Sequence, residues 1–462
     1  MSTMPRGIRL VITIFIALFS TFTIASPVYE FTLANGLKLL VKEDHRSPVA
    51  ISQVWYKVGS SYEPGGITGI SHALEHMMFK GTTKYPAGVF SRIIASNGGE
   101  ENATTSDDYT YYYQEVAADK LKLCFQLEAD RMKNLLLSPQ EFAKEIQVVI
   151  SERHMRTDDN PQSLTYERFA ASAYIASPYH HPVIGWIDDL NHLTSTDLRQ
   201  WYQAWYAPNN AIIVVVGDVN PQQVLQMATN YFGSIPAATL PTLKPQQEVP
   251  PLGTRRVTVQ TPAELPWIIL GYNVPSLKTA PQAWQAYALE VLAAILDGGS
   301  SARLSKDILR GTQAATDTNA SYDLNSRLDT LFTLDATPAS GHTLAELESA
   351  LLQQIQRLQT QVVSNEELAK VKAQVVANKI YQKDSIVQQA SELGMLVSVG
   401  LSWQASDDYV KQIQAITPQQ LQSVAKLYFS PERLTVGILE PQAKSMQSKS
   451  TEHIAVGEQN VR

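Results

Sequence analysis

An internal repeat is the feature of this 462-residue sequence that most constrains its fold. Residues 193–216 and 416–439 share one order, a Thr-initiated helix, a proline turn and an apolar strand, at an offset of 223 residues. A second pair, Ser138–Lys144 and Ser364–Lys370, shares a capped helix start at an offset of 226 residues. One structural unit that occurs twice predicts two related α+β domains of about 200 residues each.

The boundary between the two domains is predicted from proline content. Residues 236–252 hold five prolines and little that could pack in a core. We therefore expect a first domain over residues 26–235, a linker over 236–252 and a second domain over 253–445. A polar tail, 446–462, follows.

The first 25 residues have the order of a secretory signal peptide. Arg6 and Arg9 precede an apolar stretch, Leu10–Ala25, and small residues precede Ser26. The stretch is too short for a comfortable membrane span, although an uncleaved anchor stays an alternative. Since no later run is long enough to span, we expect a periplasmic or secreted protein without a stable membrane span after cleavage.

Charge and cysteine content exclude two further classes. The net charge is −7 and long Lys/Arg runs are absent, which argues against a nucleic-acid partner. Cys124 is the only cysteine, so an intrachain disulfide is impossible. It lies in an apolar run that is typical of a helix face, which favours a packed thiol over a nucleophile.

Turn residues predict two local structures in the first domain. Apolar runs on both sides of Asn35-Gly36 indicate a β-hairpin. Pro86 is expected to open a helix that Gly98 and Gly99 close.

The run His72-Ala-Leu-Glu-His76 carries the predicted chemistry. Residues four apart lie on one face of a helix, so His72 and His76 can bind one ion. Glu75 is adjacent and can reach a metal-bound water without being a ligand. A hydrolytic zinc site needs a third protein ligand from elsewhere, commonly a carboxylate.

Chance is a poor explanation of this motif. In a chain with nine histidines a random His-x-x-Glu-His has a probability on the order of one percent. The motif also lies in an apolar, glycine-bounded stretch, where unpaired His and Glu side chains would be costly to bury.

The His-x-x-Glu-His order is the inverted zincin motif, and its surroundings resemble the pitrilysin/insulinase family of metallopeptidases. The resemblance covers nearly the whole mature chain. The matching segments are 59–64, 69–82, 97–99, 102–104, 108–110, 179–185 and 217–219.

The resemblance implies the rest of the metal site. It implies one Zn²⁺ per chain, with Glu152 as the third ligand and Glu75 as the general base. Glu152 also interrupts an apolar helix with a carboxylate that would need a partner. Glu145, two helical turns earlier, supports the site by resemblance, although from the residues alone it could be a solvated charge.

The resemblance also implies a fold and a second domain without metal. Each domain should be a mostly antiparallel sheet with helices packed on one face. At the repeat offset Glu152 falls on Asn378, and Tyr287–Val291 aligns loosely with His72–His76. The second domain is therefore expected to keep the architecture and lack the metal.

Substrate and partner predictions rest on the resemblance as well. Asn102 and Ala103 match the edge strand on which an extended peptide adds as a further strand. Arg310 matches a substrate-binding Arg of the second domain, but Asp317 stands where a Tyr is expected. This departure predicts a homodimer, or a heterodimer with a related metal-free subunit.

The sequence thus predicts an exported zinc endopeptidase that acts on peptides or unfolded protein segments. One alternative is a non-catalytic or weakly active assembly subunit that needs a related partner. Another is a periplasmic module that binds zinc or peptide without turnover. Glu75 favours the enzyme, because binding alone requires no base there.

Overall fold

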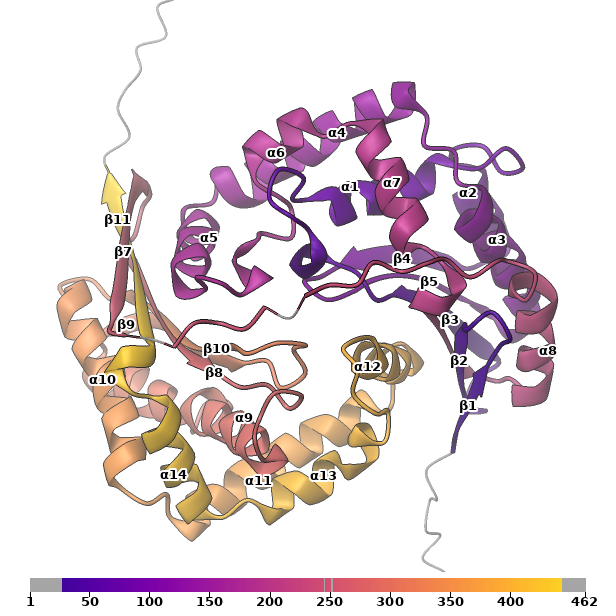
Figure 1. The fold of residues 1–462 in the computed structure, drawn as a ribbon. Coiled ribbons are helices and arrows are strands. Elements are labelled where there is room, and N and C mark those ends of the chain that lie inside the picture. The colour runs from indigo at the N-terminus through magenta and orange to yellow at the C-terminus, as the bar shows by residue number, and fades with distance from the viewer. Residues whose placement is uncertain (1–26, 245, 251, 443–462) are drawn as a thin grey trace, which may run out of the picture.

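The computed structural model describes residues 27–244, 246–250 and 252–442. The expected signal peptide and polar tail lie outside the described residues. Two α+β halves face each other in Figure 1, each with its own sheet. The described part of 236–252 runs between them without helix or strand.

The first sheet has six strands in the order β1-β2-β6-β3-β5-β4. β2 and β6 are parallel, and all other neighbours are antiparallel. The predicted hairpin is confirmed, because Asn35 and Gly36 lie in the turn between β1 and β2. The strands are β1 (Val28–Thr32), β2 (Lys38–Glu43), β3 (Val49–Tyr56), β4 (Glu100–Thr105), β5 (Thr110–Ala117) and β6 (Ala211–Gly217).

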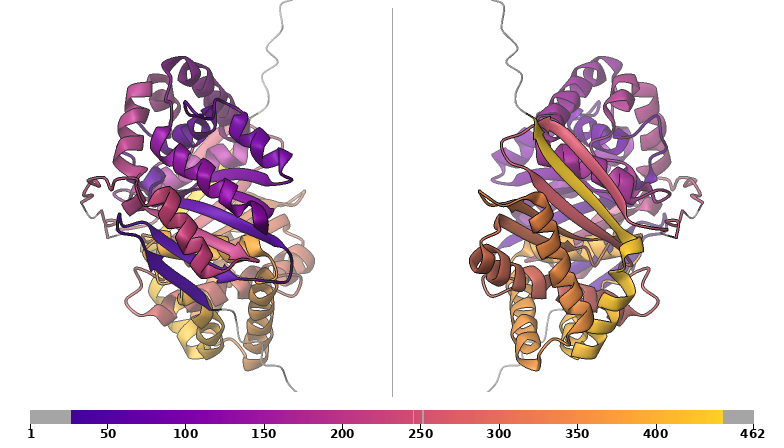
Figure 2. Two further views of the ribbon diagram at one scale, coloured as in Figure 1. Left: turned by 90° about the vertical axis from the view of Figure 1, so that its right-hand side faces the viewer. Right: turned by 90° about the vertical axis from the view of Figure 1, so that its left-hand side faces the viewer.

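The second sheet has five strands in the order β7-β11-β8-β10-β9. β11 pairs in parallel with β7 and antiparallel with β8, as β6 does with β2 and β3. Figure 2 shows β7 and β11 side by side. The strands are β7 (Arg255–Pro262), β8 (Trp267–Val274), β9 (Ala315–Tyr322), β10 (Thr330–Pro338) and β11 (Leu434–Gln442). The shared neighbour pattern confirms the repeat.

Most helices of the first half lie on one face of its sheet and enclose an apolar core. The predicted start at Pro86 is wrong, because the α-helix begins three residues later, after Gly88 in the left-handed region. Pro86 instead forms an isolated β-bridge with Gly81. The helices are α1 (Ile70–Met77), α2 (Val89–Ser96), α3 (Leu121–Asn134), α4 (Pro139–Arg153), α5 (Pro161–Ala173), α6 (Ile187–His192), α7 (Ser195–Trp205) and α8 (Pro221–Phe232).

The helices of the second half repeat this arrangement. Thr194 and Thr417 form matching capping boxes before the two repeated helices. The predicted cap at Ser138 is confirmed, because its side chain accepts a hydrogen bond from the Glu141 N–H, while the Glu141 side chain binds Lys144. The helices are α9 (Ala283–Asp297), α10 (Leu344–Thr360), α11 (Asn365–Gln382), α12 (Ile386–Ser398), α13 (Ala405–Ala415) and α14 (Pro418–Tyr428).

Two sequence predictions concern single features of these helices. Cys124 is buried in α3, and burial raises the pKa of its thiol to about 12, which agrees with a packed thiol. Among the described residues no helix combines the length and the apolar character that a membrane crossing requires.

The two halves exchange a helix. α12 of the second half lies on the outer face of the first sheet, where Ala390 and Leu393 pack with Trp55. α5 of the first half lies on the second sheet, where Phe169 packs with Trp267. α5 and α12 follow the repeated helices α4 and α11, so the exchange is reciprocal.

Glycines permit the close approach of α12 to the first sheet and of α5 to the second sheet. A Cβ at Gly394 of α12 would lie 2.2 Å from the Trp55 ring. A Cβ at Gly271 of the second sheet would lie 2.5 Å from the Phe169 ring. Each exchanged helix therefore contacts the other half at a distance that only glycine allows.

Gly394→Ala is expected to lower the free energy of unfolding by about 2 kcal/mol, because overpacking displaces α12 from Trp55. Chemical denaturation followed by tryptophan fluorescence measures the change. Gly65→Ala is the matched control, since a Cβ there meets nothing within 4 Å. Equal stability of the two variants would show that α12 does not depend on this contact.

A buried carboxylate supports the first turn of α1. The N-cap, Gly69, is in the left-handed region and has no side chain to cap the helix. Glu63 is 3% exposed and accepts the N–H groups of Gly69 at 2.7 Å and Ser71 at 2.8 Å. Burial is the larger effect and raises the pKa of Glu63 from 4.5 to about 7.

Glu63 is expected to make stability fall as pH rises. Between pH 4.5 and about 7 the folded chain binds more protons at Glu63 than the unfolded chain, so rising pH favours unfolding. The loss approaches about 3 kcal/mol and ends above pH 7. Urea unfolding of wild type and Glu63→Gln at pH 5 and pH 8 tests this, because the amide cannot ionise. Parallel pH dependences would contradict it.

Candidate metal centre

Two packed helices bring the three predicted ligands together. His72 and His76 lie one turn apart on α1, and Glu152 lies near the end of α4, which packs against α1. One ligand atom from each lies within 4.8 Å of the other two. The Glu152 Oε2 atom is 3.8 Å from His72 Nε2 and 3.3 Å from His76 Nε2.

The donor set fits zinc. Two imidazole nitrogens and one carboxylate are the ligands of hydrolytic zinc sites, which leave a fourth position open. The two rings are nearly perpendicular, at 77°, with centroids 4.8 Å apart. Burial, with His76 and Arg156 nearby, lowers the pKa of His72 to about 3. His72 is therefore neutral at physiological pH, which is the form that binds a metal.

Glu145 is a partner of His76 and not a solvated charge. Its Oε1 atom is 2.9 Å from His76 Nδ1, and Lys80 Nζ lies 2.6 Å from its Oε2. A hydrogen bond at Nδ1 leaves Nε2 free to face Glu152, which is how second partners orient metal-binding histidines. Arg156 holds the other oxygen of Glu152, with Nε 3.0 Å from Oε1.

Glu75 lies beside the ligands without being one of them. Burial raises the pKa of its carboxyl group. Its Oε2 accepts a hydrogen bond from the Thr105 hydroxyl at the end of β4. The segment matched in the sequence, 102–104, stops one residue short of Thr105. Alternation from Ala103 along the strand could have indicated Thr105, whereas its contact with Glu75 depends on the fold.

A cavity of about 1340 Å³ contains this centre. The first half contributes the ligands, Glu75, Asn102 and Ala103, and the second half contributes Trp267, Asp323, Ser326 and Thr330. β4 is the edge strand of its sheet, so Asn102 and Ala103 lie where a further strand could add. These two predicted substrate residues are therefore close to the metal ligands.

Arg310 is not brought to this cavity. It lies in the π-helical segment Leu304–Thr312 and donates to the carbonyls of Ser300 and Ser305. Neither Arg310 nor Asp317 is among the described residues that line the cavity.

The second half has a counterpart of the site without its ligands. Asn378 lies on α11 at the repeat offset from Glu152, and Tyr287–Val291 on α9 aligns loosely with His72–His76, which places Glu290 opposite Glu75 and no histidine opposite either ligand. Within the described ranges, His72, His76 and Glu152 are the one group of three residues that could hold a metal ion.

An ion pair joins the corresponding helices of each half, buried in the first half and partly buried in the second. Arg153 on α4 binds Glu167 on α5 at 2.8 Å, and Lys379 on α11 binds Glu392 on α12 at 2.6 Å. Arg153 and Lys379 are 226 residues apart, and their partners Glu167 and Glu392 are 225 residues apart, so each pair joins a repeated helix to the exchanged helix that follows it.

Protein-family models match both halves of the chain. Residues 38–185 match the model described as Insulinase (Peptidase family M16), and residues 192–375 match the one described as Peptidase M16 inactive domain. The first match contains His72, His76 and Glu152, and the second contains most of the metal-free half.

Relatives that match over most of their length support the same family assignment. The chain is 32% identical to the zinc protease PqqE of Helicobacter pylori, over 90% of this chain and 93% of that protein. A crystal structure of a protease from Helicobacter pylori has a TM-score of 0.85 at 31% identity and covers 90% of this chain and 100% of that one. The periplasmic protease PqqL from Escherichia coli shares the fold, with a TM-score of 0.76 at 18% identity over 90% of this chain and 48% of that one.

Two family matches, a zinc-protease relative across nine-tenths of the chain, and a candidate His-His-Glu site together show that this chain belongs to the insulinase family of zinc metallopeptidases, peptidase family M16.

Proposed function

We propose that the chain is an exported zinc endopeptidase that hydrolyses peptides or unfolded protein segments. The observation that carries this proposal is the convergence of the three ligand atoms within 4.8 Å, with Glu75 beside them. His72, His76 and Glu152 hold one Zn²⁺, and Glu145 fixes the ring of His76.

The chain's own groups move the proton. When bound here, zinc lowers the pKa of a water and polarises the scissile carbonyl. Glu75 accepts the proton of that water and delivers it to the leaving amine. Thr105 donates to one carboxylate oxygen of Glu75 and leaves the other for this exchange.

An extended peptide fits the cavity. Added to β4, it pairs with the backbone at Asn102 and Ala103 and runs past the ligands. Val148, Met155 and Tyr166 line the same cavity with exposed fractions of 49%, 67% and 49%. Such apolar side chains favour substrates that present apolar residues, as unfolded segments do.

Glu75→Gln is expected to retain zinc and lose at least about a thousandfold in kcat, because the amide cannot accept the proton. Zinc content by mass spectrometry and cleavage of a quenched fluorescent peptide measure the two effects. His72→Phe should lose the zinc as well.

Glu141→Gln is the control for Glu75→Gln, since Glu141 lies on α4 but pairs only with exposed Lys144. Unchanged cleavage by Glu75→Gln would refute the mechanism. Zinc bound without cleavage by wild type would favour the binding module or the assembly subunit.

We also propose that the enzyme works as a homodimer, or as a heterodimer with a related metal-free subunit. The support is that Arg310 is exposed and does not line the cavity of its own chain, and that Asp317 stands where a Tyr is expected. Export to the periplasm or beyond is supported by the signal-like first 25 residues.

Mixing two inactive variants tests the homodimer. If Arg310 serves the partner's site, Glu75→Gln and Arg310→Ala are each inactive, and subunit exchange between equal amounts restores about a quarter of wild-type activity. Light scattering gives the mass of each species. A fully active monomer would overturn the dimer proposal.

A further inference from the structure

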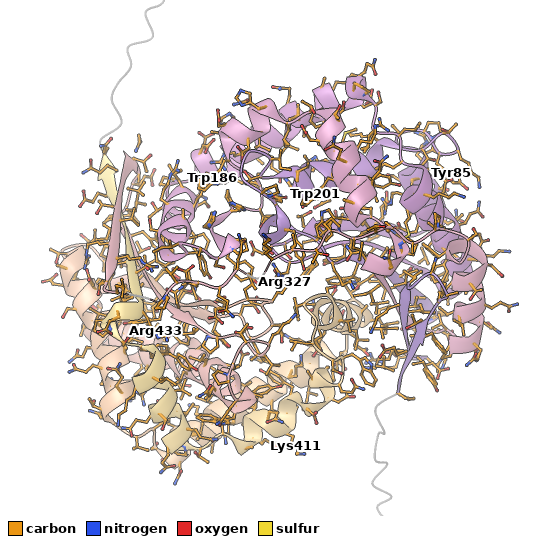
Figure 3. The ribbon with its side chains drawn as sticks, viewed as in Figure 1. Tyr85, Trp186, Trp201, Arg327, Lys411 and Arg433 are labelled. Atoms are coloured by element: carbon orange, nitrogen blue, oxygen red, sulfur yellow. The ribbon has the colours of Figure 1, made fainter. Side chains whose placement is uncertain are left out.

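One loop of the second half reaches the metal-site cavity. Residues 323–329 join β9 to β10, and Asp323 and Ser326 from this loop line the cavity. Arg327 from the same loop lies between the two halves in Figure 3. The metal-free half thus forms part of the wall opposite the ligands.

Arg327 is held by a dense set of contacts in the first half. Its backbone N–H and its Nε each donate to Asp108 at 2.9 Å, and its Nη2 donates to Ser61 at 2.7 Å. The guanidinium group lies 4.3 Å from the centroid of the Tyr62 ring. Asp108 is 4% exposed, so the pair is largely removed from water.

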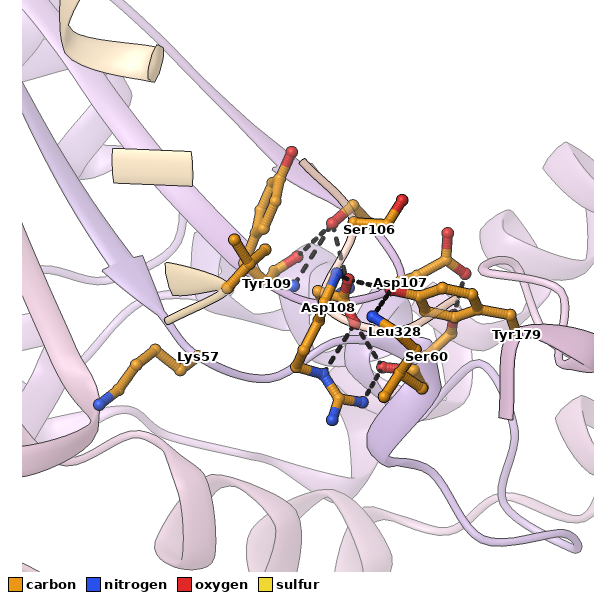
Figure 4. Close-up of polar contacts among 12 residues, drawn as sticks. Lys57, Ser60, Ser106, Asp107, Asp108, Tyr109, Tyr179 and Leu328 are labelled. Carbon is orange, nitrogen blue, oxygen red and sulfur yellow. Dashed lines mark hydrogen bonds and ion pairs between the residues drawn. The ribbon is translucent and has the colours of Figure 1, made fainter. Parts of the chain in front are cut away.

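Figure 4 shows a further bridge at the same carboxylate. The Tyr179 hydroxyl donates to Asp108 and accepts the Leu328 N–H at 3.1 Å. The Asp108 carboxylate raises the pKa of this phenol beyond what burial alone does, which keeps the hydroxyl a donor. Arg327 supplies the positive charge that this buried carboxylate contacts.

Asp108 lies in the short loop that follows Thr105, the residue that contacts Glu75. Thr105, the last residue of β4, donates its hydroxyl to Glu75, and residues 106–109 then turn into β5. The Asp107 carbonyl accepts the Ser61 N–H at 2.8 Å. A Cβ at Gly59 would lie 2.1 Å from the Ser106 carbonyl oxygen, so the turn is tightly enclosed.

We propose that Thr105 and Arg327 are positioning residues for Glu75. The Thr105 hydroxyl fixes the carboxylate of the base. Arg327 of the second half binds Asp108 and so holds the loop that follows Thr105. The second half therefore acts on the chemistry of the first half through Thr105 and the loop of residues 106–109 that follows it. This inference rests on the proposed role of Glu75 as base.

The chain offers a matched control for interdomain contact in general. Arg46 of the first half pairs with Asp384 of the second at 3.2 Å and donates to the Lys383 carbonyl. This pair lies by α12, and none of its residues lines the metal-site cavity. Arg46→Met removes an interdomain ion pair without touching the loop that reaches Glu75.

The first experiment separates kcat from KM. In full-length, zinc-loaded protein, Arg327→Met and Thr105→Val should each lower kcat by about tenfold to a hundredfold with KM within about threefold, because a misplaced base slows chemistry. Thr105→Ser keeps a hydroxyl and should recover most of the kcat. Arg46→Met should keep wild-type kcat, and zinc content should stay equal in all variants.

The second experiment does not depend on peptidase activity. Hydrogen exchange should accelerate at the amides of residues 106–109 in Arg327→Met and stay unchanged there in Arg46→Met. Wild-type kcat in Arg327→Met, or equal loss in Thr105→Val and Thr105→Ser, would overturn the inference. A lower kcat in Arg46→Met equal to that in Arg327→Met would also overturn it, in favour of general interdomain support.

The two proposals can fail separately. If wild type and Glu75→Gln cleave peptide equally, the assigned base is wrong and the inference falls with it. If Glu75→Gln is inactive while Arg327→Met is fully active, the base is right and only the positioning role is wrong.

Discussion

The packing of α1 against α4 is the contact on which the site depends. α1 supplies two imidazoles and Glu75, and α4 supplies Glu152 together with Glu145, the partner of His76. Neither helix holds a metal alone, because a hydrolytic site needs three protein ligands. Buried side chains on both helices pack in the core of the first half, which fixes the distance between the helices and so brings the ligands together.

The reciprocal exchange of α5 and α12 makes the two halves one body. Each sheet keeps its own helices on one face and receives a helix from the other half on the opposite face. The Arg153–Glu167 and Lys379–Glu392 pairs hold these helices in the same way. As a result, residues of the metal-free half become part of the wall around the metal ligands.

Most of the sequence predictions that the structure confirms came from local patterns. The repeat, the Asn35-Gly36 hairpin and the His-x-x-Glu-His spacing depend on neighbours in sequence, and the structure agrees with each. Glu152 required a family resemblance, since nothing in the sequence alone gives the angle at which α4 crosses α1. The predicted start at Pro86 failed because Pro86 pairs with Gly81 in a local β-bridge, and the helix begins only after Gly88.

Contacts between segments that are distant in sequence could not be predicted from the sequence. Arg327 and Asp108 are 219 residues apart, and neither belongs to a motif that predicts the other. Thr105 lies one residue beyond the residues singled out in β4, and its role depends on the rotation of α1 beneath that strand. The outward position of Arg310 likewise follows from its local π-helix and not from its resemblance to a substrate-binding residue.

The exchanged helices also determine when the first half can complete its fold during synthesis. The outer face of the first sheet, with Trp55 at its centre, stays uncovered until residues 386–398 have been made. At about 5–20 residues per second, some 150 residues after the end of the first half leave that apolar face open to aggregation for roughly ten seconds or more. A chain that crosses a membrane unfolded and folds once it is complete escapes this interval, because both exchanged helices are then available at the same moment.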